Sequence, residues 1–164
     1  MKNIFFFLLL LGSMTTSAQA TFRIFNFTSS TIRFELQTIG GTTRLRSHNT
    51  TPGQSTFDLT AGNSVTYTNA GGTFPFYTTP TVTPNITRWY RVTSPSSTWI
   101  LTASATAQST YGALQTFNYI KFDVISALHP WGGNLGLSPF GNYLMSSDSF
   151  YIAEWIGNDI YISE

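Results

Sequence analysis

The feature of this sequence that most constrains its fold is the alternation of apolar and polar residues with a period of two. In residues 31–37 (TIRFELQ), Ile32, Phe34 and Leu36 alternate with polar side chains. Successive side chains of a β-strand point to opposite faces, so this stretch predicts a strand with one buried and one solvated side. Residues 117–125 repeat the pattern, and no stretch shows a sustained helical period. The chain is therefore predicted to consist mainly of strands.

Turn residues divide the chain into short segments of this kind. The predicted strands are residues 22–27, 31–37, 42–46, 55–59, 64–68, 86–93, 99–103, 117–125, 149–156 and 160–163. Polar turns at 28–30 and 157–159 predict hairpins between the first two strands and between the last two. About 8–10 short strands at this spacing predict a single antiparallel β-sandwich, immunoglobulin-like or jelly-roll-like, with a flattened barrel as the alternative.

A Gly-polar-Ser sequence occurs twice within residues 52–72, as Gly53-Gln54-Ser55 and as Gly62-Asn63-Ser64. Glycine gives the backbone freedom that a turn needs, so each copy predicts a turn that leads into a strand. The run 60–67 (TAGNSVTY) resembles the loop-to-strand entry of many extracellular immunoglobulin-like modules. The chain has no cysteine and so lacks the Cys-Trp-Cys core signature of antibody domains. The resemblance therefore concerns turns and implies no function.

Two stretches do not follow the strand pattern. Residues 71–85 contain three prolines among aromatic residues, and proline cannot donate a hydrogen bond to a sheet. Residues 129–148 contain four glycines together with Trp131, Phe140 and Tyr143. Both stretches are predicted to be loops. The second either covers one open end of the sandwich or contacts a ligand, because long loops in compact domains are often functional.

The N-terminus has the three parts of a secretory signal peptide. Lys2 provides a positive charge, residues 4–11 (IFFFLLLL) are apolar, and Ala18-Gln19-Ala20 matches the small-x-small cleavage pattern. We expect cleavage near Ala20, which leaves residues 21–164 as a single domain that is secreted, periplasmic or held at the cell surface. The apolar run is shorter than the roughly 20 residues that span a bilayer, so no transmembrane segment is predicted.

Net charge argues against two classes of partner. Loss of Lys2 with the leader leaves seven basic residues against seven acidic ones. Nucleic-acid-binding proteins carry a basic surface, and peripheral proteins of anionic membranes do as well. The sequence therefore predicts no nucleic-acid partner and no electrostatic attachment to a membrane.

Groups that perform catalysis are scarce. The chain has two histidines, His48 and His129, no cysteine and no Gly-x-Ser-x-Gly motif. Both histidines are predicted to be loop residues, and no metal site or cofactor is predicted. Glu154, next to Trp155, is the best candidate for a carboxylate in a catalytic cleft, although a solvent-facing strand position explains it better. We therefore expect no enzyme activity.

Aromatic residues offer the clearest functional candidates. Flat rings can stack on the apolar faces of sugars, and arginine can bond their hydroxyl groups, although rings of this kind also fill the core of any sandwich. The candidate ligand-binding residues are Trp89, Arg91, Trp131, Tyr143 and Trp155. The sequence thus predicts an exported, non-enzymatic binding or envelope-assembly module with a protein or glycan partner. The alternatives are a small carbohydrate-binding protein that uses exposed Trp and Tyr, and a hydrolase with a carboxylate in a cleft. The oligomeric state stays open.

Overall fold

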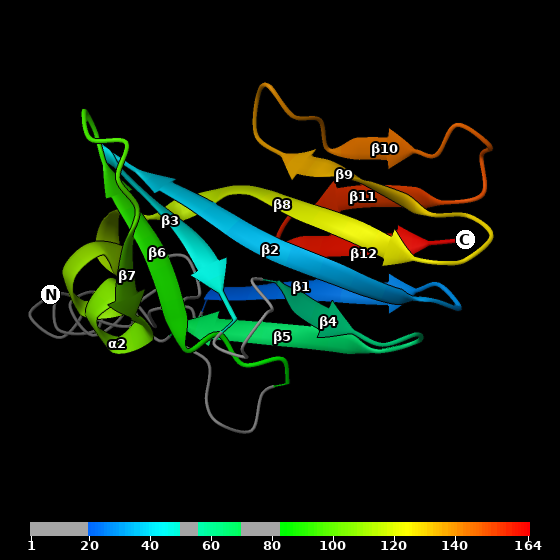
Figure 1. Cartoon of the computed structure of the whole chain (residues 1–164), viewed down its shortest axis with the longest axis horizontal. Coiled ribbons are helices and arrows are strands. Elements are labelled where there is room, and N and C mark those ends of the chain that lie inside the picture. Colours follow the sequence, from blue (N-terminus) through cyan, green and yellow to red (C-terminus); the bar gives the residue numbers. More distant parts are fainter. Residues whose placement is uncertain (1–19, 50–55, 70–82) are drawn as a thin grey trace, which may run out of the picture.

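Two β-sheets pack against each other in the computed structural model of this chain, which describes residues 20–49, 56–69 and 83–164 (Figure 1). Within these residues the sheets do not close into a barrel, and the prediction of an all-β sandwich is confirmed. The Gly53 turn and most of the proline-rich stretch lie outside the described residues.

The smaller sheet has five strands in the order β10-β11-β12-β1-β5. Their bounds are Tyr143–Met145 for β10, Ile152–Ile156 for β11, Asp159–Ser163 for β12, Ala20–Phe27 for β1 and Ser64–Asn69 for β5. The first and last strands of the chain, β1 and β12, run parallel to each other, and the other pairs are antiparallel. The middle strand of this sheet is therefore the C-terminal one.

The larger sheet has seven strands, six of them in the order β7-β6-β3-β2-β8-β9, with β4 paired to β2. Their bounds are Ile100–Ala103 for β7, Arg88–Thr93 for β6, Thr43–His48 for β3, Thr31–Gly40 for β2, Thr116–Ile125 for β8, Trp131–Gly136 for β9 and Phe57–Leu59 for β4. A short helical segment joins β7 to β8 and consists of α2 (Ser104–Thr106), η1 (Ala107–Tyr111) and η2 (Gly112–Leu114). This segment was not predicted, because its sequence has no amphipathic period.

The core lies between the two sheets and follows the predicted alternation. Ile32, Phe34 and Leu36 of β2 are fully buried, and Ile160 and Ile162 of β12 face them from the smaller sheet. Burial of apolar area at roughly 25 cal/mol per Å² is the main stabilising contribution in such a core. The rigid core holds the outward-facing side chains of both sheets in fixed rows.

The predicted hairpin between residues 22–27 and 31–37 is wrong, because β1 and β2 belong to different sheets. The buried side chain of Asn26 holds the connection between them. Its Oδ1 accepts hydrogen bonds from the backbone N–H and the hydroxyl of Thr28, and its Nδ2 donates to the carbonyls of Ser30 and Leu59. The turn at 28–30 therefore carries the chain across the sandwich, so the apolar sides of β1 and β2 meet across the core.

The prediction that residues 129–148 form a loop is also wrong, because they contain β9 and β10. Glycine-rich sequence seldom forms strands, but here it allows β9 to lie very close to β8. A Cβ atom at Gly132 would overlap the carbonyl of Phe122, and one at Gly136 would overlap the carbonyl of Asn118. The glycines thus reflect close packing between two backbones.

Candidate functional site

Trp89 and Arg91, two of the five residues predicted to bind a ligand, share one side of β6. Trp89 has no solvent exposure and belongs to the core. The guanidinium carbon of Arg91 lies 5.2 Å from the ring centroid of Tyr111, and its Nη1 donates to Oγ1 of Thr93 at 3.1 Å. Trp89 is thus placed to stabilise the fold, and Arg91 packs against the helical segment.

The other three predicted residues lie on β9, β10 and β11, away from β6. Trp131 is half-buried, with its ring centroid 5.1 Å from that of Phe122. Trp155 is half-buried against Phe117, at 4.8 Å between centroids. Tyr143 is exposed on the outer face of the five-stranded sheet. The structure therefore does not bring the five residues together into one surface.

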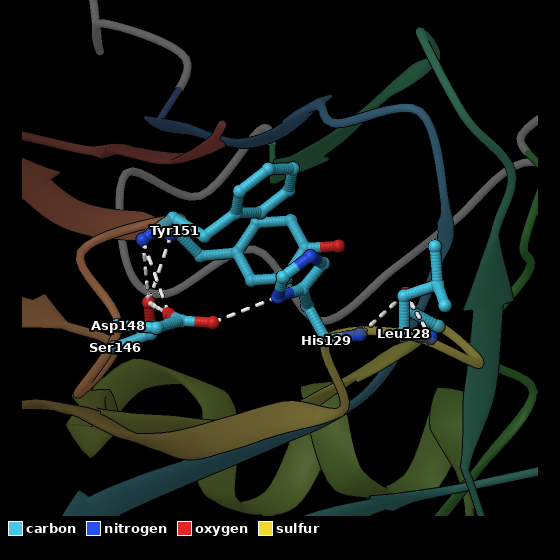
Figure 2. Close-up of polar contacts among 7 residues, drawn as sticks. Leu128, His129, Ser146, Asp148 and Tyr151 are labelled. Atoms are coloured by element: carbon cyan, nitrogen blue, oxygen red, sulfur yellow. Dashed lines mark hydrogen bonds and ion pairs between the residues drawn. The ribbon is translucent and has the colours of Figure 1, made fainter.

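A polar cluster joins the turn before β9 to the turn before β11 (Figure 2). Nδ1 of His129 lies 2.8 Å from Oδ2 of Asp148, and the hydroxyl of Ser146 donates to Oδ1 of the same carboxylate. The backbone N–H groups of Phe150 and Tyr151 donate to Oγ of Ser146 at 3.0 and 2.9 Å. The imidazole ring of His129 also stacks on Phe150, at 4.2 Å between centroids.

The order of groups in this cluster differs from that of a Ser-His-Asp triad. In such a triad the histidine stands between the serine and the acid, whereas here Asp148 stands between Ser146 and His129. The hydrogen bonds from Ser146, His129 and the N–H of Phe150 lower the pKa of Asp148 to about 2. This geometry locks two turns together and gives no support to a nucleophilic role for Ser146.

A second cluster lies on the outer face of the seven-stranded sheet, over β3, β6 and the start of β7. Leu45, Ser47 and Trp89 are buried, so the positions between them point outward. Together with Trp99, just before β7, these outward positions form what we call the arginine-aromatic face. Its members are Arg44, Arg46, His48, Arg88, Tyr90 and Trp99.

Arg46 is the cation of the arginine-aromatic face that packs against aromatic rings. Its guanidinium carbon lies 4.8 Å from the ring centroid of Trp99 and 5.5 Å from that of Tyr90. The ring of His48 lies 4.5 Å from the ring of Tyr90. Contacts between a guanidinium and aromatic faces hold the cation in one orientation while part of it stays in solvent. The face thus presents a cation that is partly fixed before any ligand arrives.

The charge of the arginine-aromatic face is positive. Strands β3 and β6 contain two arginines each, and neither these strands nor β7 contain an acidic residue. Glu35 of β2 provides the one described carboxylate in ion-pair range, with its Oε2 3.6 Å from Nε of Arg46. Arg44 and Arg88 are exposed and form no ion pair with a described residue. Burial raises the pKa of Glu35, while Arg46 and Lys121 act in the opposite direction.

Two nitrogen atoms of this face are buried without a hydrogen-bond partner in the described part of the chain, Nε of Arg46 and Nδ1 of His48. Burial lowers the pKa of His48, and the neighbouring charges of Arg46 and Arg88 lower it further, so the imidazole is neutral at neutral pH. Buried polar atoms are normally satisfied by protein, water or ligand. Both atoms are shielded from solvent, and Nε of Arg46 lies beside the carboxylate of Glu35.

The arrangement favours anions over metal ions. Exposed guanidinium groups bind carboxylates and phosphates through paired N–H donors. Over residues 20–49, 56–69 and 83–164, no group of three or more His, Asp or Glu side chains is placed to hold a metal ion. Over the same residues, no helix has the length and apolarity needed to cross a bilayer.

Comparison with known proteins identifies no relative of this chain. No protein-family model, curated protein or solved structure matches it. The function must therefore be inferred from the chemistry of its own surfaces.

Sequence reasoning missed Arg44, Arg46 and His48 as a group. Their alternation with buried residues in TRLRSH is a visible signal for an outward basic strand. The pairing of β3 with β6, which places Arg88 opposite His48 and Tyr90 opposite Arg46, links residues 40 and 44 positions apart. No local sequence pattern predicts that pairing.

Proposed function

We propose that this protein is an exported, non-catalytic binding module whose arginine-aromatic face binds an acidic polysaccharide. The observation that supports the proposal most directly is the excess of cations on β3 and β6, where Arg44 and Arg88 are exposed and unpaired in the described part of the chain. The predicted leader supports export, because acidic glycans are common polymers outside the cytoplasm.

The mixture of groups favours a sugar acid over a simple anion. Arginine can bind a carboxylate through two parallel N–H···O bonds. The rings of Tyr90 and Trp99 offer apolar surface to the C–H groups of a sugar. A strip that crosses several strands suits a linear polymer, which can occupy successive positions along it.

The proposal is tested by titration of the protein with polygalacturonate, a carboxylated glycan, and with dextran as a neutral glycan. We expect binding to polygalacturonate that weakens with added salt, and no binding to dextran. The double variant Arg44→Gln/Arg88→Gln should weaken binding at least about tenfold, since hydrogen bonds to charged groups contribute roughly 1.5–3 kcal/mol.

Arg33→Gln is the matched control, because Arg33 is on the same sheet but is already paired with Asp58 at 2.8 Å. It should bind like the wild type. Equal loss in this variant, or no binding of the wild type to polygalacturonate, would contradict the proposal. Binding to single-stranded DNA that matches or exceeds binding to the glycan would replace it with a different ligand class.

A substitution of Glu35 tests the same proposal through an expected increase in affinity. Its carboxylate lies beside Arg46 and reduces the positive potential of the arginine-aromatic face. Glu35→Gln keeps the size of the side chain and removes the charge, so we expect tighter binding of polygalacturonate by a few-fold at low salt. Isothermal titration calorimetry at two ionic strengths measures the change. Weaker binding in Glu35→Gln would mean that the carboxylate organises the site.

A further inference from the structure

The outer face of the five-stranded sheet is unusually apolar for a surface exposed to solvent. Leu144 and Ala153 point toward the core, so their neighbours in β10 and β11 point outward. On this face Ile156 is 60% exposed, Phe27 57% and Met145 52%. An antiparallel sheet normally places polar residues on its solvated side, and a contiguous apolar patch marks an interaction site. We call this surface the apolar sheet face.

Aromatic rings occupy the middle of the apolar sheet face. The rings of Phe25 and Tyr161 stack at 5.0 Å between centroids with an angle of 5°, and the ring of Phe27 lies 5.6 Å from that of Phe25. Because each ring covers the face of its neighbour, the ring edges point toward solvent. This arrangement offers little open ring surface for stacking a sugar and favours an occupant that packs against it broadly.

The charges on the apolar sheet face are nearly balanced. Arg23 forms a two-bond ion pair with Asp159, and the hydroxyl of Tyr161 donates to the same carboxylate at 3.1 Å. Glu154 is the carboxylate on this face without an ion pair among the described residues. A good occupant therefore brings apolar area together with one cation for Glu154.

We propose that the occupant is the same face of a second copy of this chain, so that the protein forms a two-fold symmetric dimer. The five strands cover roughly 400 Å² of flat area at a spacing of about 4.8 Å and a rise of about 3.3 Å per residue. Protruding side chains raise the accessible area toward the roughly 800 Å² per partner of a standard interface. A reversible dimer is the form that such an area supports.

The order of strands makes the face complementary to itself. β12 is the middle strand, with β11 on one side and β1 on the other. A two-fold axis along β12 places β11 of one copy over β1 of the other. By the strand register, this brings Glu154 opposite Phe25 and Ile152 opposite Phe27. The guanidinium carbon of Arg23 lies 5.5 Å from the ring centroid of Phe25. Unlike charges thus approach, and apolar groups cover apolar groups.

The dimer is independent of the proposed glycan binding, because the two surfaces lie on different sheets. Where both hold, the two arginine-aromatic faces of the dimer point in opposite directions and can engage two polymer strands. Multiple engagement raises the overall avidity without any new contact.

The first test is sedimentation of residues 21–164 over a range of concentrations. We expect a concentration-dependent dimer in the wild type and a monomer in the double variant Phe27→Glu/Met145→Glu, which adds charge at two exposed positions. Ile125→Glu is the matched control, since Ile125 is 48% exposed on the other sheet. Circular dichroism establishes that each variant is folded. A wild type that stays monomeric at its highest soluble concentration, or a dimer that survives the double variant, overturns the proposal.

The second test locates the symmetry axis. The chain has no cysteine, so a single introduced cysteine reports one position. Ser163→Cys lies on β12 and should be cross-linked to its copy by a bis-maleimide that spans about 10 Å, the spacing of sheets packed face to face. Thr66→Cys on β5, two strands from β12, should not react in this way, since the copies would be about 19 Å apart across the sheet. Cross-linking through Thr66→Cys and not through Ser163→Cys would contradict this dimer.

Discussion

At the scale of single residues, Asp148 shows how one side chain can serve three partners at once. It accepts hydrogen bonds from the hydroxyl of Ser146 and from the N–H of Phe150, and it lies 2.8 Å from Nδ1 of His129. Together these partners fix the two turns at the end of the sandwich where β9 begins and β11 follows. The exposed carboxylate of Asp148 thus stabilises the contact between two turns, and the local sequence SSDS does not predict this role.

The lowered pKa of Asp148 predicts a specific pH dependence of stability. The native state favours the carboxylate, since its pKa falls from 3.8 to about 2 on folding. The resulting stabilisation is present above pH 3.8 and is lost as the pH falls toward 2. Asp148→Asn cannot ionise, so its free energy of unfolding should fall less steeply in this window than that of the wild type. Urea unfolding at several pH values measures both slopes.

His129→Phe is the informative companion variant, because it keeps a ring against Phe150 and removes the nitrogen beside Asp148. The pKa of Asp148, followed by carbon NMR of the carboxyl group, should rise in this variant. An unchanged value would assign the whole shift to Ser146 and the N–H of Phe150. If the free energy of unfolding fell equally steeply with pH in Asp148→Asn and in the wild type, the link between the pKa of Asp148 and stability would be contradicted.

At the scale of elements, β9 is the strand that sequence reasoning could not find. Gly132, Gly133 and Gly136 give β9 low strand propensity. Close contact with β8 explains Gly132 and Gly136, and the side chain of Leu144 in β10 lies against Gly133. Ten predicted strands appear close to their expected positions, because their alternation is local. β9 and β10 were missed because their residues are explained by contacts with neighbouring strands and not by a local pattern of alternation.

Gly136→Ala tests this explanation. An added Cβ would overlap the carbonyl of Asn118 and the Cα of Tyr119, both of which are backbone atoms that cannot rotate away. We expect a loss of about 1–3 kcal/mol in the free energy of unfolding, as for other overpacked positions. Gly141→Ala is the control, since its Cβ would meet Tyr143 at an ordinary 3.5 Å. A Gly136→Ala variant as stable as Gly141→Ala would show that β9 can move away from β8.

At the scale of the whole molecule, the fold class and the hairpin between β11 and β12 could be predicted, and the rest of the strand arrangement could not. Alternation and turn spacing indicate a sandwich, but they do not say which strands far apart in sequence are neighbours. The turn at 28–30 looks like a hairpin and instead joins the two sheets, because Asn26 is buried between them. The candidate site could be predicted only in part for the same reason. The individual arginines can be read from the sequence, but their position on one face depends on the pairing of β3 with β6.

The parallel pairing of β1 with β12 has a consequence for when this protein can fold. The ion pair between Arg23 and Asp159 joins positions 136 residues apart, and β12 separates β1 from β11 in the finished sheet. Contacts this distant in sequence form late and slowly. Until β12 has been synthesised and can pair with β1 and β11, the smaller sheet is missing its middle strand. During that interval the unpaired edges of β1 and β11 are accessible to chaperones and proteases.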